Sequence, residues 1–321
     1  MLASICHHLC PSPLPVVTAA GGSVDETAYS VERPALRPLG RDTSPELIVE
    51  QLRTVGCALL PSIISPPTVA RLGRLLSGYD IGLSEELQRS DPLLSKLAGP
   101  HQRGADVVGF GQKTEGVKSE LLGNIFNRDP DWLELLDPSP VIEVADLILG
   151  DTCHLVTQKA WRNGPGHDSG GSFHVDELFV EGFPEELASD PRYEPPIHII
   201  TALTYLVDVG PELCPTYVVP QSFRSSRRPH TGETSWRDNT PMVVIAKAGD
   251  TLLFRSDVWH SGGLNVTSDT TRLLCETVYG ARKVAQKFWP YVEFKLNPAT
   301  RAAATERQMR LLGVHGISNY G

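Results

Sequence analysis

Apolar positions recur at helical spacing in the first part of the chain and fall into short runs in the second. Three segments begin with Ser-Pro, at Ser44, Ser65 and Ser139, and continue with apolar residues on one face. A capping Ser followed by Pro is a typical helix start, and the first and third segments end at Gly56 and Gly150. The pattern predicts three early helices, a short strand at 57–60, and strands at 153–160, 197–207, 216–219, 242–246, 250–254 and 271–280.

Many short strands separated by turn residues indicate two packed β-sheets. We therefore expect a mainly β fold, a double-stranded β-helix (jelly roll, cupin-like) core with flanking α-helices. Residues 1–33 mix Pro, Ser, Gly and Ala without a period and are expected to form a disordered tail. Residues 34–321 are expected to form a single domain, with a helical part at about 44–150, the jelly-roll core at about 151–282 and a C-terminal extension at 283–321.

Composition excludes several classes of partner. A net charge of −9 argues against nucleic acid, which needs clustered basic residues. The one basic cluster, Arg224, Arg227 and Arg228, is either a solvated loop or an entrance that attracts an anion. Six scattered cysteines indicate neither a zinc site nor a disulfide framework, and no apolar stretch is long enough to cross a membrane. We expect a soluble, cytoplasmic protein without a nucleic-acid or membrane partner.

A candidate metal site is encoded by His174-Val175-Asp176 and by His260. Side chains two residues apart on an extended segment lie on the same face, so His174 and Asp176 can bind one ion while Val175 points away. His260 follows the predicted strand at 250–254 and offers a third ligand. Two imidazoles and one carboxylate are the facial triad of non-haem iron(II) oxygenases. Zinc is the competing metal, but a zinc hydrolase needs a general base and the H-E-x-x-H helix is missing from the sequence.

Arg272 stands at the start of the next predicted strand, across a Gly-rich turn from His260. A hairpin return of this kind can place the guanidinium beside the metal, where its fork matches a carboxylate. The alternative is a surface ion pair, which is common for arginine and weak.

These residues resemble the phytanoyl-CoA dioxygenase family of Fe(II)/2-oxoglutarate dependent enzymes, in particular members that modify natural products. The resemblance covers about residues 46–282. It rests on the early helix, Gly56 with its strand and a second helix, His174-x-Asp176, Thr201-Ala202-Leu203, Pro220-Gln221-Ser222-Phe223, Gly249-Asp250, and His260-Ser-Gly-Gly-Leu-Asn265 followed by Arg272.

The resemblance implies Fe(II), 2-oxoglutarate and O2 as cofactor and cosubstrates. Iron is then held by the His174, Asp176 and His260 triad, and Arg272 pairs with the distal carboxylate of 2-oxoglutarate. Gln158 resembles a family position from which a polar side chain contacts 2-oxoglutarate, and Thr204 is a second candidate.

The implied reaction is oxidation of an unactivated C–H bond in a small secondary-metabolite substrate, by hydroxylation, desaturation or oxidative rearrangement, with release of succinate and CO2. Three alternatives stay open: a 2-oxoglutarate independent iron oxygenase in which Arg272 holds a substrate acid, an acyl-CoA hydroxylase, and a non-catalytic partner subunit. The resemblance also suggests a homodimer. His167, in the loop before the first ligand, is either a lid residue or simply exposed.

Overall fold

The computed structural model describes residues 33–79, 119–169, 171–178, 184–188, 190, 192–288 and 294–314. The predicted tail at 1–33 lies outside these residues, except for Arg33. In chain order the elements are α1 (Pro45–Thr54), β1 (Cys57–Leu60), α2 (Pro66–Gly78), β2 (Ser119–Gly123), the 3-10 helices η2 (Ile125–Asn127) and η3 (Pro130–Leu135), α5 (Val141–Leu149), β3 (His154–Asn163), α6 (Glu185–Ala188), β4 (Ile199–Tyr205), β5 (Thr216–Val218), η4 (Ser222–Ser225), β6 (Met242–Val244), β7 (Thr251–Arg255), β8 (His260–Gly262), β9 (Arg272–Gly280), α7 (Pro298–Ala303) and α8 (Glu306–Leu311).

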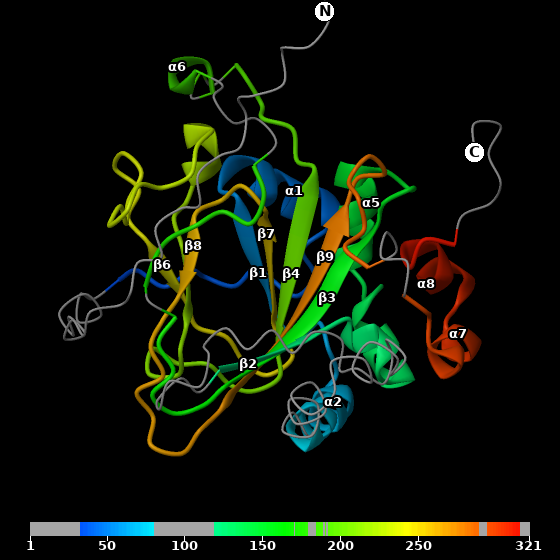
Figure 1. Ribbon diagram of the computed structural model, residues 1–321. Helices are drawn as coiled ribbons and strands as arrows, with labels where there is room; N and C mark the ends of the chain where they lie inside the picture. The colour runs from blue at the N-terminus through cyan, green and yellow to red at the C-terminus, as the bar shows by residue number, and fades with distance from the viewer. Residues whose placement is uncertain are drawn as a thin grey trace, which may run out of the picture. The chain divides into compact units, whose positions relative to one another are not determined.

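Two antiparallel sheets form the core (Figure 1). The larger sheet has the strand order β1-β7-β4-β9-β3-β2, and the smaller has the order β6-β5-β8. The predicted helices and strands are present, with ends shifted by a few residues, whereas β2 and the three-residue β8 had not been predicted. This is the mainly β, jelly-roll architecture that the strand pattern predicts.

The helices begin where local chemistry favours a start. Ser65 caps α2, because its hydroxyl accepts a hydrogen bond from the backbone N–H of Thr68 and Pro66 occupies the first turn. α8 has a complete capping box between Thr305 and Gln308. Among the described residues, no helix combines the length and the apolar character needed to span a bilayer.

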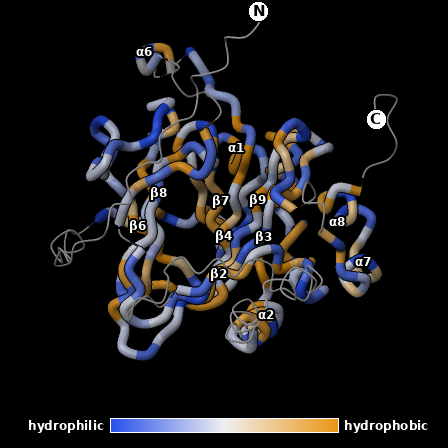
Figure 2. The backbone as a smooth tube through the Cα atoms, in the orientation of Figure 1, coloured by the Kyte–Doolittle hydropathy of each residue, from blue (hydrophilic) through white to orange (hydrophobic). Residues whose placement is uncertain are grey.

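The larger sheet is buried on both faces. Its outer face packs against α1, α5 and α8 through residues such as Leu52, Val144 and Leu311, and against α2 and η3 through Leu72 and Trp132. Its inner face packs against the smaller sheet in a second cluster, which includes Leu59, Leu203, Val218, Phe254 and Leu274. Figure 2 shows apolar residues gathered on the central strands β4, β7 and β9. Polar side chains on this inner face are therefore exceptions that need an explanation.

The turn before β7 depends on Gly249. Its φ is +95°, and a Cβ on this residue would lie 2.5 Å from the carbonyl oxygen of Ile64. We expect Gly249→Ala to lower the free energy of unfolding by about 2–6 kcal/mol, because a left-handed non-glycine residue and a steric overlap each cost about 1–3 kcal/mol. Urea denaturation measures the loss.

Gly150 provides the matched control. Its φ is +89°, but a Cβ there would meet nothing within 4 Å. Gly150→Ala should therefore cost only the dihedral part, about 1–3 kcal/mol. Equal losses in the two variants would show that the contact with Ile64 does not matter.

Candidate metal centre

His174, Asp176 and His260 are brought together from two distant parts of the sequence. His260 begins β8, and the segment that carries His174 pairs with it in antiparallel fashion: each residue donates its backbone N–H to the other's carbonyl oxygen, at 2.9 and 3.0 Å. Asp176 N–H donates to the Ser256 carbonyl at 2.9 Å. Val175 packs against Trp236 and Trp259 on the other side, as the alternation predicts.

The three side chains offer one ligand atom each, and these atoms lie within 4.8 Å of one another. Asp176 Oδ1 is 3.5 Å from His260 Nε2 and 4.0 Å from His174 Nε2. An ion bound at ~2.1 Å by neighbouring octahedral positions holds its ligand atoms ~3 Å apart, so a small closure suffices to bind one. The donor set of two imidazoles and one carboxylate fits iron(II) and leaves three coordination positions for other ligands.

Further contacts orient the ligands. His174 Nδ1 lies 3.3 Å from the Ser172 carbonyl oxygen, and His260 Nδ1 lies 3.1 Å from that of Val258. A proton on each Nδ1 leaves Nε2 free to bind a metal, the arrangement that usually supports a ligating histidine. Thr201 Oγ1 donates to Asp176 Oδ2 at 3.5 Å, and the ring of Phe254 packs 4.7 Å from that of His260.

The electrostatics of the cluster favour an ionised carboxylate. Burial opposes charge on Asp176, but the charge and hydrogen bond of His260 and the charge of His174 outweigh it, and the pKa of Asp176 is lowered to about 2. Desolvation, followed by the charge of His260, lowers the pKa of His174. Asp176 is therefore ready to bind a cation at neutral pH, and His174 is kept neutral, as a metal ligand must be.

Polar residues continue along the inner face from the metal cluster toward Arg272. β3 and β9 pair there in register, so Lys159 lies opposite Glu276, Trp161 opposite Leu274 and Asn163 opposite Arg272. Lys159 Nζ is 3.6 Å from Glu276 Oε1. Burial first, and then the charge of Asp176, raises the pKa of Glu276 against the effect of Lys159. We call these paired residues of β3 and β9 the inner wall. It has a charged pair near the metal cluster, an apolar pair in the middle and an amide–guanidinium pair at the far end.

Arg272 is an inner-face residue and not a surface ion pair. Its side chain is buried, with 6% of the residue exposed. Nη1 donates to the Cys214 carbonyl, and Nη2 donates to Asn163 Oδ1 at 3.3 Å. These two bonds fix the plane of the guanidinium, while its Nε has no hydrogen-bond partner among the described residues. A buried guanidinium with unused donors fits an anionic ligand.

Gln158 and Thr204 lie on the outer face of the sheet, away from the metal cluster, and this placement does not support the prediction that they contact the cosubstrate. Gln158 Nε2 donates to the Trp132 carbonyl and to Thr277 Oγ1, both at 3.3 Å. Thr204 Oγ1 is 3.0 Å from Thr251 Oγ1. Because side chains alternate along a strand, the residue after Gln158, Lys159, is the one that faces the metal cluster.

Four residues near the site had not been predicted to be part of it: Thr201, Lys159, Glu276 and His167. Glu276 could have been noticed in the sequence, since it is the one acidic residue of β9. His167 had been expected to be exposed or in a lid, but only 8% of it is exposed, and it lies close enough to Arg272 for that charge to lower its pKa.

The contacts of Arg227 and Arg228 favour the interpretation of the basic cluster as a loop over that of an anion entrance. Arg227 binds Glu233 through two hydrogen bonds of 2.8 Å and lies over the ring of Trp259. Arg228 Nη1 donates at 3.2 Å to the carbonyl oxygen of Val175, between the two ligands His174 and Asp176. Arg228 therefore helps to fix the segment that presents those ligands.

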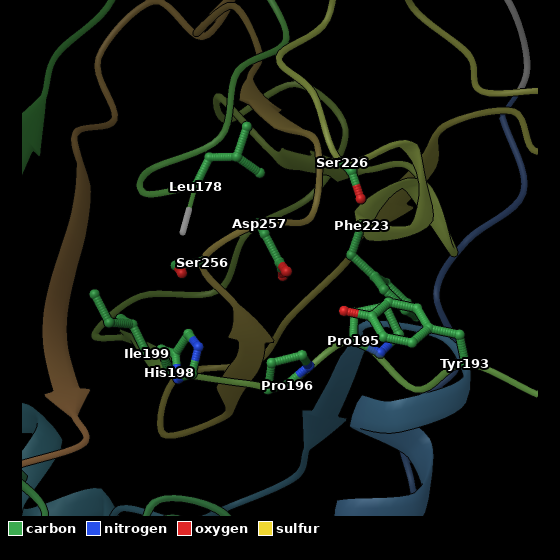
Figure 3. A pocket seen from close by; sticks show the side chains of 10 residues that line it. All are labelled: Leu178, Tyr193, Pro195, Pro196, His198, Ile199, Phe223, Ser226, Ser256 and Asp257. Carbon is green, nitrogen blue, oxygen red and sulfur yellow. The ribbon is translucent and has the colours of Figure 1, made fainter. Parts of the chain in front are cut away.

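A pocket lies next to this segment, on the side of Ser256. Figure 3 shows Leu178, Ile199 and Phe223 around the carboxylate of Asp257. Arg255 already neutralises that carboxylate, with Nε and Nη2 at 2.6 and 2.8 Å from its two oxygens. The pocket therefore has apolar walls and a carboxylate that is already paired. It lies beside the segment that carries His174 and Asp176.

Comparisons with known proteins agree with this fold. The solved structures that are similar include the "non-heme alpha ketoglutarate dependent epimerase SnoN from nogalamycin biosynthesis" (TM-score 0.51, 19% identity, covering 74% of this chain and 80% of that one). They also include HygX from Streptomyces hygroscopicus, solved with nickel and 2-oxoglutarate bound (0.51, 17%, 75% and 88%), and AviO1 from Streptomyces viridochromogenes Tue57 (0.50, 16%, 77% and 98%). At these identities the similarity establishes the jelly-roll fold.

The sequence comparisons establish the family. A search among curated proteins finds no significant match. Residues 101–273, more than half of the chain, match the family described as phytanoyl-CoA dioxygenase (PhyH), and this range contains the triad and reaches one residue beyond Arg272. The chain therefore belongs to the phytanoyl-CoA dioxygenase family.

Proposed function

We propose that this protein is an Fe(II)- and 2-oxoglutarate-dependent dioxygenase that oxidises an unactivated C–H bond of a small molecule and releases succinate and CO2. The observation that carries this proposal is a two-His, one-carboxylate cluster that contacts the inner face of the larger sheet at Thr201 and Phe254, together with a buried arginine on that same face. On β9, Arg272 and Glu276 are four residues apart, which is about 13 Å along a strand. An arginine side chain and a five-carbon diacid can together span such a distance.

Each part of the inner wall then has a role. His174, Asp176 and His260 hold the iron, which with 2-oxoglutarate and O2 supplies the oxidising chemistry. Arg272 binds the distal carboxylate with a fork held by Cys214 and Asn163. Trp161 and Leu274 offer apolar walls for the methylene groups between the two ends of the cosubstrate.

The substrate class rests on related proteins. HygX has been solved with hygromycin B, and SnoN comes from nogalamycin biosynthesis, so both belong to antibiotic chemistry. We propose a small natural product as the substrate of this chain as well. The charged pair of Lys159 and Glu276 beside the metal cluster favours a substrate with polar groups over a purely hydrocarbon one.

Succinate formation tests the proposal. Purified protein supplied with Fe(II), O2 and 2-oxoglutarate should release succinate slowly on its own and faster with an accepted substrate, with one succinate for each oxidised product. Protein without added iron is the control. Substrate-dependent O2 uptake without succinate would instead establish a 2-oxoglutarate independent oxygenase, and protein that binds no iron would establish a non-catalytic role.

A further inference from the structure

Two buried nitrogen atoms at the arginine end of the inner wall have no hydrogen-bond partner among the described residues. They are Nε of Arg272 and Nδ1 of His167. Both residues are more than nine-tenths buried, with 6% and 8% exposed. Buried polar atoms almost always have a partner, because burial without one is costly. Two such atoms in one region point to a ligand that satisfies both.

The backbone fixes His167 beside the arginine. Asn163, whose Oδ1 accepts from Arg272 Nη2, ends β3, and a turn follows in which His167 N–H donates to the Gly164 carbonyl at 3.0 Å. The carbonyl of His167 accepts from the N–H of Asn265 at 2.9 Å. Asn265 in turn binds the Asn163 carbonyl through its side chain, at 3.0 Å. The turn is thus anchored on both sides to the residues that surround Arg272.

The charge state of His167 suits an anion site that already contains a guanidinium. Burial first, and then the positive charge of Arg272, lowers the pKa of His167 to about 4, while Asp168 acts in the opposite direction. The ring is therefore neutral at neutral pH. A neutral imidazole with its proton on Nδ1 donates a hydrogen bond without adding a second positive charge next to Arg272.

We propose that His167 donates a hydrogen bond from Nδ1 to the distal carboxylate of the 2-oxo acid beside Arg272, and so determines the preference of the site for a dicarboxylic cosubstrate. This inference rests on the proposed function, in which Arg272 binds that carboxylate. The other reading is that His167 only stabilises its turn. A structural residue would affect all 2-oxo acids equally, whereas a carboxylate ligand affects only those with a second carboxylate.

Binding to the full-length protein loaded with Ni(II) separates these readings without turnover. The two probes are 2-oxoglutarate and 2-oxopentanoate, which has the same chain length but no distal carboxylate. We expect His167→Leu to weaken 2-oxoglutarate binding by about 10- to 100-fold, as for the loss of one hydrogen bond to a charged group. The affinity for 2-oxopentanoate should stay within about threefold of the parent protein.

Two further variants sharpen the test. His167→Asn should keep most of the affinity, because the amide nitrogen of Asn occupies nearly the position of Nδ1 and can donate the same bond. His230→Leu, the same change at an exposed loop histidine, should alter neither affinity. Calorimetric titration measures all of these values, and a melting curve shows that each variant is folded.

The outcomes distinguish this inference from the proposed function. Equal loss for both acids in His167→Leu, or no loss for either, overturns the role of His167. If Arg272→Ala nevertheless weakens the binding of 2-oxoglutarate but not that of 2-oxopentanoate, the proposed function stands without a role for His167. If Arg272→Ala binds both acids like the parent protein, the proposed function itself is wrong at this site.

Discussion

Iron binding and turnover should both be lost when His174 or His260 is replaced by alanine. In the proposed site each imidazole supplies one of the three ligands identified among the described residues, and even the loss of a residue that merely orients a ligand weakens metal binding 10- to 100-fold. We therefore expect more than about a hundredfold weaker iron binding and almost no succinate formation in either variant. Metal analysis after dialysis and a succinate assay measure the two effects.

Two further variants serve as comparisons: Thr201→Val should have an intermediate effect, and His230→Ala is the control. Thr201 contacts Asp176 Oδ2 at 3.5 Å but is not one of the three proposed metal ligands, so removing its hydroxyl should weaken iron binding by about tenfold. His230 is an exposed loop histidine, and its replacement should leave iron content unchanged. Full iron content and activity in both His174→Ala and His260→Ala would disprove the assignment of the metal site.

The order of the elements could be predicted because it depends on local chemistry. Ser-Pro starts and glycine ends define the early helices, and β-branched runs between turn residues define most of the strands. β8 was not predicted because its sequence, His-Ser-Gly, has no β-branched residue, and the strand is stabilised by its partners, Val218 on β5 and the segment at His174. Such a strand exists through tertiary pairing, which no local pattern records.

The grouping of His174, Asp176 and His260 could also be predicted, because the spacing of His174 and Asp176 fixes a common face whatever surrounds them. The sequence could not predict which side chains of β3 and β4 lie on the inner face of the sheet. β4 is buried at all seven positions and the first five positions of β3 are buried, so hydrophobic alternation, which normally separates core from solvent, carries no information there. For this reason the strand pattern could not check the assignment of Gln158 and Thr204, which came from the resemblance alone, and it did not point to Lys159 and Thr201 instead.

The register between β3 and β9 is the second feature that could not be predicted from the sequence. Pairing places Asn163 opposite Arg272 and Lys159 opposite Glu276, and a slip of one residue would send all of these side chains to the other face. The bulge between Leu155 and Thr157 helps to set this register. The sequence indicates that Arg272 is a candidate to bind a carboxylate, but it does not indicate which residues hold its guanidinium.

Replacing Arg272 with alanine should weaken 2-oxoglutarate binding by two to four powers of ten. Its guanidinium is buried, so the variant leaves the distal carboxylate of the cosubstrate without its charge partner, a loss of about 3–5 kcal/mol. Arg272→Lys should recover only part of the affinity, because lysine keeps the charge but loses the planar fork that Cys214 and Asn163 hold in place. The measurement is the apparent affinity for 2-oxoglutarate at saturating iron and substrate.

Folding must be controlled in this experiment, because Arg272→Ala also removes the donor to the Cys214 carbonyl and to Asn163 Oδ1. A lower melting temperature with retained iron binding shows that the metal cluster is intact, since its ligands come from other segments. Comparison with 2-oxopentanoate isolates the distal carboxylate, because a general distortion of the pocket weakens both acids. If 2-oxoglutarate affinity is unchanged while substrate affinity collapses, Arg272 holds the substrate, and the enzyme is a 2-oxoglutarate independent iron oxygenase.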